Sequence, residues 1–120
     1  ELIDGAGRKN AGMLLDAYHL ERSGAGGRGF EGVDPSELAA FQYSDAPPAP
    51  VAAGVKRPTD RLLPGQGVVR WLEVFKLLKQ KGFVHLSYEA PNPELWKRSP
   101  VELCREAVEL TRSLIKKALN

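Results

Sequence analysis

The strongest constraint on the fold is a repeated change in the spacing of apolar residues, from the alternation of strands to the spacing of helices. Three segments are predicted as strands: residues 11–16 (AGMLLD), 39–44 (AAFQYS) and 83–89 (FVHLSYE). Helical spacing covers residues 68–81 and 99–118, and residues 34–37 (DPSE) carry the signals of a short helix start. Strands that alternate with helices indicate an α/β protein in which helical crossovers join parallel strands.

Two connections lack this periodicity and are predicted as loops. Residues 21–32 (ERSGAGGRGFEG) are rich in glycine. Residues 45–67 contain prolines at positions 47, 48, 50, 58 and 64. Long aperiodic segments are uncommon in compact domains and often carry function, so the second connection is a candidate functional loop.

Length and composition exclude several classes of protein. The chain has 120 residues, less than half of the roughly 250 that a complete eight-stranded βα barrel needs. The net charge of +2 comes from scattered residues, which argues against a nucleic-acid partner. A single cysteine and two histidines give no disulfide and no zinc motif, and no apolar run is long enough to span a membrane. We expect a cytoplasmic protein with no membrane partner, and we place Cys104 in the core on the apolar face of the last helix.

Polar side chains occupy the ends of the predicted strands. Asp16 ends the first strand, Gln42 lies in the second opposite the bulky Phe41, and Glu89 ends the third opposite Tyr88. The carboxyl ends of parallel strands meet at one edge, where barrel enzymes place their active sites, and oxygen donors there suit Mg²⁺ or Mn²⁺. Taken singly, each of these residues is more often a helix cap or a solvated turn residue, and only the three together, on strands of consistent alternation, favour a site.

Four stretches resemble a known family. They are residues 14–19 (LLDAYH), 41–46 (FQYSDA), 61–67 (RLLPGQG) and 87–96 (SYEAPNPELW). In order and spacing they are similar to the strand ends and the R-x-x-P-G-x-G turn of the xylose-isomerase-like sugar phosphate isomerase/epimerase superfamily. The resemblance implies that residues 1–120 are one partial domain, the C-terminal three βα units of a (β/α)8 TIM barrel, with the N-terminal part absent.

The resemblance also implies roles for five residues. Asp16 and Glu89 match metal ligands, and Gln42 stands where many members have histidine. Glu89 is in addition the implied catalytic acid or base, while His19 and Arg61 match substrate-contacting positions. The implied cofactor is a divalent metal, Mn²⁺ or Mg²⁺, whose remaining glutamate ligand would lie upstream of this chain. The alternatives are that His19 bonds to the backbone and that Arg61 is a surface residue.

The implied function is proton transfer next to a carbonyl, through a metal-stabilised enediolate, on a small sugar or polyol. The alternatives are a related dehydratase of the inosose or dehydroshikimate type, and a non-catalytic half-barrel that serves as a binding or structural module. Either the missing N-terminal barrel half or self-association must cover the open sheet, and the isolated chain is expected to be inactive. An upstream segment of roughly 150 residues with a βα pattern would favour the enzyme, and a Met directly before Glu1 the half-barrel.

Overall fold

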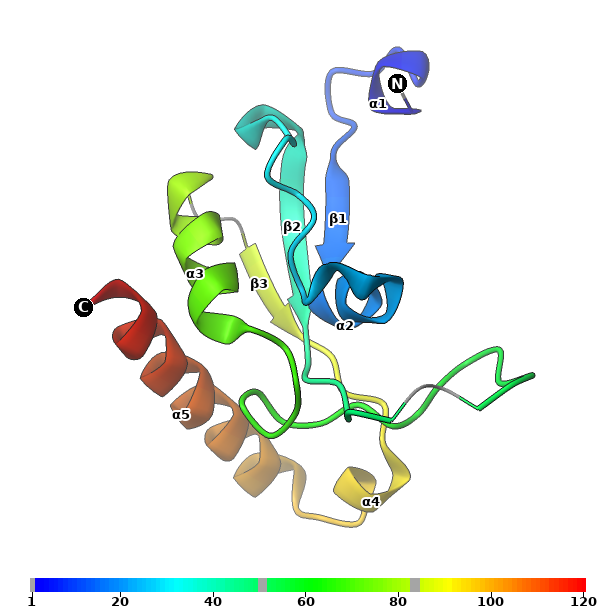
Figure 1. Cartoon of the computed structure of the whole chain (residues 1–120), viewed down its shortest axis with the longest axis vertical. Coiled ribbons are helices and arrows are strands. Elements are labelled where there is room, and N and C mark those ends of the chain that lie inside the picture. The colour runs from blue at the N-terminus through cyan, green and yellow to red at the C-terminus, as the bar shows by residue number, and fades with distance from the viewer. Residues whose placement is uncertain (1, 50–51, 83–84) are drawn as a thin grey trace.

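The structure is a computed structural model, and it describes residues 2–49, 52–82 and 85–120 (Figure 1). The strands are β1 (Met13–Asp16), β2 (Leu38–Tyr43) and β3 (His85–Tyr88). The helical elements are α1 (Leu2–Gly5), α2 (Ala17–Leu20), the wide turn η1 (Glu21–Ala25), the 3-10 turn η2 (Pro35–Glu37), α3 (Trp71–Gln80), α4 (Pro93–Trp96) and α5 (Pro100–Leu119). Residues 83 and 84, with which the third predicted strand begins, lie outside the described residues.

The three strands form one sheet in the order β1-β2-β3, and both strand pairs are parallel. The register places Asp16 beside Gln42 and Gln42 beside Ser87. Helical elements follow each strand, as Figure 1 shows. The α/β class and the parallel strand order are therefore confirmed, and the polar strand ends lie at one edge of the sheet.

The two faces of the sheet differ as the alternation predicts. Phe41 and Tyr43 of β2 are buried in the core, and the Tyr43 ring contacts the Trp71 ring of α3 edge-on at a centroid distance of 6.0 Å. The Tyr43 hydroxyl lies 3.0 Å from Thr111 Oγ1 of α5, so both long helices cover this face. On the other face Leu14 is 54% exposed, the side that a closed barrel would enclose.

The glycine-rich connection differs from its prediction as a loop, because it begins in helix. The Asp16 carboxylate accepts a hydrogen bond of 2.9 Å from the Tyr18 backbone N–H and so caps a helical segment that runs through α2 and η1. Gly24 has a φ of +89° within η1, and Gly26 follows in the left-handed region, so the glycines end the helix instead of excluding it. The helix start predicted at residues 34–37 is only the 3-10 turn η2, which leads into β2.

The placement of Cys104 in the core was wrong, because its side chain is exposed. The stripe of α5 that is buried contains Ala107, Thr111 and Ala118. Cys104 lies on the flank of this stripe, as does the 44% exposed Val108, and no element in the described part of the chain covers them. None of the described helices is both long and apolar enough to cross a membrane.

Candidate functional site

The five residues singled out from the sequence line one open pocket of about 540 Å³ at the carboxyl edge of the sheet. Asp16 comes from the end of β1, Gln42 from β2, and Glu89 from the residue after β3. His19 lies in α2, and Arg61 comes from the proline-rich connection. The pocket is completed by Leu14, Leu15, Leu20 and Ser23. The structure thus brings all five together, while their roles stay predictions.

Arg61 occupies the centre of this pocket. Its Nη1 donates a 2.8 Å hydrogen bond to Asp16 Oδ2 and longer ones, of 3.3 and 3.4 Å, to Ser44 Oγ and to the Glu89 backbone oxygen. The Glu89 carboxylate lies 3.8 Å from the same nitrogen. The Arg61 and Asp16 side chains are each 7% exposed, so this is a buried ion pair and the surface alternative for Arg61 is wrong.

His19 contacts the other terminal nitrogen of Arg61, with 3.2 Å between Nη2 and the imidazole Nε2. A guanidinium can only donate hydrogen bonds, so Nε2 is the acceptor in this contact. The His19 side chain is 66% exposed. The ring therefore lies partly open to solvent at the pocket and bonds to a side chain, whereas the alternative interpretation had predicted a bond to the backbone.

Two backbone connections hold Arg61 at this position. Asp45 and Leu62 form an antiparallel bridge, with both N–H to oxygen distances at 2.9 Å, which returns the proline-rich connection to the end of β2. The Asn92 side-chain amide, which also caps α4, donates a 2.9 Å hydrogen bond to the Arg61 backbone oxygen. The end of the proline-rich connection is thus held against the sheet by these hydrogen bonds, which place Arg61 in the pocket.

Asp45 organises this return, and sequence reasoning missed its importance. It is fully buried, and Oδ1 accepts hydrogen bonds from the backbone N–H groups of Ala46 (2.9 Å) and Val69 (3.0 Å). Oδ2 accepts bonds of 2.7 Å from the Gly65 backbone and from the Trp71 indole. Periodicity does not signal such a residue, because its partners lie as far as 26 positions along the chain.

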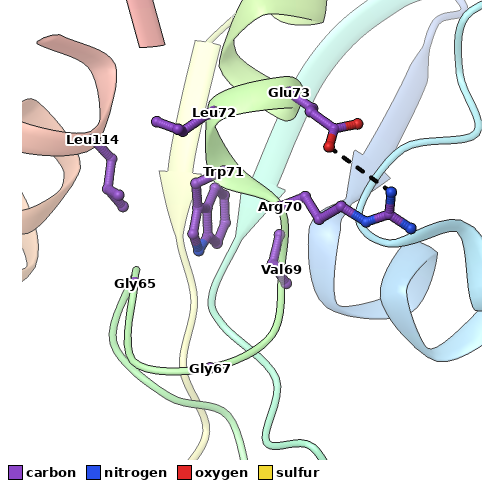
Figure 2. A pocket seen from close by; sticks show the side chains of 8 residues that line it. All are labelled: Gly65, Gly67, Val69, Arg70, Trp71, Leu72, Glu73 and Leu114. Atoms are coloured by element: carbon purple, nitrogen blue, oxygen red, sulfur yellow. Dashed lines mark ion pairs between the residues drawn. The ribbon is translucent and has the colours of Figure 1, made fainter. Parts of the chain in front are cut away.

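A second pocket, of about 340 Å³, lies between the start of α3, the 65–67 turn and Leu114 (Figure 2). Trp71 fills its centre, and the side chains of Arg70 and Glu73 form an ion pair of 3.8 Å directed away from the indole. It contains none of the five predicted site residues. Because its charged residues are paired and its other lining residues are apolar or glycine, we assign no chemistry to it.

The first pocket suits a divalent cation in the kind of donors it offers. Asp16, Gln42 and Glu89 supply carboxylate and amide oxygens, which are ligands for Mg²⁺ or Mn²⁺. Asp16 already bonds to the Tyr18 backbone and to Arg61, but each carboxylate oxygen has a second lone pair. Across residues 2–49, 52–82 and 85–120, no three His, Cys, Asp or Glu side chains converge to hold a metal. A complete coordination shell therefore needs water or ligands from outside the described residues.

Parallel strands with helical crossovers, and polar side chains gathered at the carboxyl ends of those strands, define an α/β protein with a site at that edge, the arrangement found in βα-barrel enzymes. Residues 1–114 match the family described as xylose isomerase-like TIM barrel, and the chain belongs to this family. The resemblance drawn from the four sequence stretches is confirmed.

Curated relatives are longer than this chain. The inosose isomerase of Halalkalibacterium halodurans is 29% identical over 118 residues, which make up 98% of this chain and 41% of that protein. The inosose isomerase of Bacillus subtilis is 26% identical over 118 residues, with 98% and 42% covered. The chain therefore spans about two fifths of the length of these relatives.

Solved structures share the fold. The IOLI protein, crystallised with a bound zinc atom, superposes with a TM-score of 0.81 at 24% identity, covering 99% of this chain and 42% of that one. A xylose isomerase domain protein from Alicyclobacillus acidocaldarius gives a TM-score of 0.73 at 21% identity, with 98% and 41% covered. The prediction that this chain is a portion of a TIM barrel is confirmed.

Proposed function

We propose that this chain is the C-terminal part of a divalent-metal-dependent isomerase or epimerase that acts on a small sugar or polyol. The observation that carries the proposal is the convergence of Asp16, His19, Gln42, Arg61 and Glu89 in one pocket at the carboxyl edge of a parallel sheet. The relatives named inosose isomerase support a ketone-bearing cyclic polyol as the substrate class.

Four residues of the pocket have chemistry that suits proton transfer next to a carbonyl. The Glu89 carboxylate is 48% exposed and can therefore reach a bound substrate as base and then as acid. Arg61 keeps Asp16 in place through their 2.8 Å ion pair and offers hydrogen-bond donors to substrate oxygens. A divalent cation bound at Asp16, Gln42 and Glu89 would supply a Lewis acid for the carbonyl and hydroxyl oxygens of the substrate.

The complete active unit would contain further βα units or a second copy of the chain. The face of the sheet that a barrel would enclose is open, with Leu14 more than half exposed, and on α5 the apolar Val101 is 66% exposed. Burial of these surfaces would stabilise a closed barrel. By the same reasoning, the 120-residue chain alone should be inactive.

The test uses the complete protein that contains this chain, incubated in deuterated water with Mn²⁺ or Mg²⁺ and an inosose. NMR then follows exchange of the proton next to the carbonyl. Glu89→Gln should slow this exchange by about 10²–10⁴-fold, because it removes the acid and base but keeps the shape of the side chain. An elimination product in the same spectra would identify the dehydratase alternative.

The matched control is Glu94→Gln on α4, which removes a 75% exposed carboxylate that pairs with Lys97 and does not line the pocket. It should exchange the proton at the parent rate, and both variants should unfold at the parent temperature. Full turnover by Glu89→Gln would defeat the proposal.

A further inference from the structure

We propose that Tyr18, Arg22 and Asp60 form a latch that positions the Arg61 guanidinium in the pocket. The inference rests on the proposed function, in which Arg61 contacts the substrate. Sequence reasoning assigned none of these three residues a role, and none of them lines the pocket. They are positioning residues, because they would act on the substrate through Arg61.

The latch joins the helical segment after β1 to the chain directly before Arg61. The Tyr18 hydroxyl donates a 2.6 Å hydrogen bond to Asp60 Oδ1. Arg22 Nη2 donates a 3.0 Å hydrogen bond to Asp60 Oδ2, and its Nη1 donates one of 2.8 Å to the Ala49 backbone oxygen. Both oxygens of the Asp60 carboxylate are therefore bonded to residues of α2 and η1, so the backbone beside Arg61 is tied to the element that also carries His19.

Tyr18 contacts Arg61 a second time, through the face of its ring. The guanidinium carbon of Arg61 lies 4.5 Å from the centroid of the Tyr18 ring, and that of Arg22 lies 5.1 Å away. Tyr18 itself is fully buried, which makes its contact with each cation stronger than at an exposed site. One side chain thus touches Arg61 with its ring and the preceding residue with its hydroxyl.

The Tyr18 ring restricts the orientation of the Arg61 guanidinium in a way that the hydrogen-bond acceptors of the pocket do not. Arg61 Nη1 serves three acceptors, of which only Asp16 is at short distance, and Nε is buried without a hydrogen-bond partner among the described residues. Together with the contact of Nη2 to His19, these bonds hold the two terminal nitrogens and leave the guanidinium plane free to tilt about the line between them. The Tyr18 face limits this tilt and so sets which donors face a substrate.

The test compares Tyr18→Phe and Asp60→Asn in the complete protein with Mn²⁺ and an inosose. Both variants should raise KM about tenfold and change kcat by less than about threefold, since binding through Arg61 weakens while Glu89 is untouched. The matched control is Tyr88→Phe, because the Tyr88 hydroxyl is buried without a hydrogen-bond partner in the described part of the chain. Its KM should equal that of the parent.

A second readout does not depend on activity. The Nε–H signal of Arg61 in nitrogen-15 NMR, assigned by its loss in Arg61→Lys, should move in Tyr18→Leu, which removes the ring over the guanidinium, and stay in place in Tyr88→Leu. An unmoved signal, or an unchanged KM in both latch variants, overturns the inference. If the parent turns over no inosose but the signal moves as expected, the latch stands and the proposed function fails.

Discussion

Replacement of Asp45 by asparagine tests how far the return of the proline-rich connection depends on one buried carboxylate. Each carboxylate oxygen accepts two hydrogen bonds: Oδ1 those of Ala46 and Val69, and Oδ2 those of Gly65 and Trp71. An asparagine amide has a single acceptor oxygen. Whichever way the amide is turned, two N–H donors then face its NH2 group and lose their partner.

The size of the effect follows from the number of bonds lost. A hydrogen bond to a charged group contributes about 1.5–3 kcal/mol, so loss of two should lower the free energy of unfolding by about 3–6 kcal/mol. Small domains have total stabilities of about 5–15 kcal/mol. Asp45→Asn should therefore remove a large fraction of the stability of the region that carries Arg61.

Urea unfolding of the complete protein, followed by circular dichroism and by tryptophan fluorescence, measures this change. The control is Asp34→Asn, an exposed cap of η2 whose carboxylate accepts a 2.8 Å hydrogen bond from Ser36 N. Asparagine caps equally well there, so its cost should be below about 0.5 kcal/mol. A loss of less than about 1 kcal/mol in Asp45→Asn would refute the reasoning, because the four bonds would then contribute little.

Three further predictions use the same unfolding measurements. Gly67→Ala should lower the free energy of unfolding by about 1–3 kcal/mol or more, because a Cβ there would lie 2.2 Å from a backbone oxygen. A Cβ at Gly32 would have no atom within 4 Å, so Gly32→Ala should not lower the free energy of unfolding through such a clash. Equal effects of the two substitutions would contradict this explanation. Tyr43→Phe should cost about 1 kcal/mol through loss of the bond to Thr111, and an unchanged value would show that this bond contributes nothing. Burial raises the pKa of Tyr88 from 10.0 to about 12 in the folded protein. The contribution of Tyr88 to stability is therefore complete at pH values below its pKa in the unfolded chain, and it is lost as the pH rises through its pKa in the folded protein. Tyr88→Phe should therefore lose less stability than the parent between about pH 9 and about pH 12, and equal losses would contradict this.

The strands, and the face of β2 that carries Gln42, could be predicted because both follow from local alternation, whereas His19 and Arg61 were predicted from the family resemblance alone. Phe41 and Gln42 occupy opposite faces of β2 simply because successive side chains in a strand do so. Asp16 and Gln42 lie side by side because they are register partners in the parallel pair of β1 and β2. A short-range pattern therefore determines which polar groups meet at the sheet edge.

The remaining features depend on contacts between residues distant in sequence or on packing partners. Tyr18 and Asp60, which are hydrogen-bonded, lie 42 positions apart, and the pattern of neighbouring residues around each of them does not predict this contact. Cys104 was misplaced because helical periodicity identifies an apolar face but not how wide a stripe of it a neighbouring helix covers. The helical start of the glycine-rich connection was missed because glycine composition outweighed the cap provided by Asp16.

The bridge between Asp45 and Leu62 has a consequence for variation in chain length. It holds both ends of the segment between them at one point of the molecule. The entropy of closing such a loop grows only with the logarithm of its length, about 0.6 kcal/mol for each doubling. Insertions and deletions between residues 52 and 59 should therefore be tolerated among relatives. Arg61 should stay at the pocket in such variants, because it directly precedes Leu62 of the bridge.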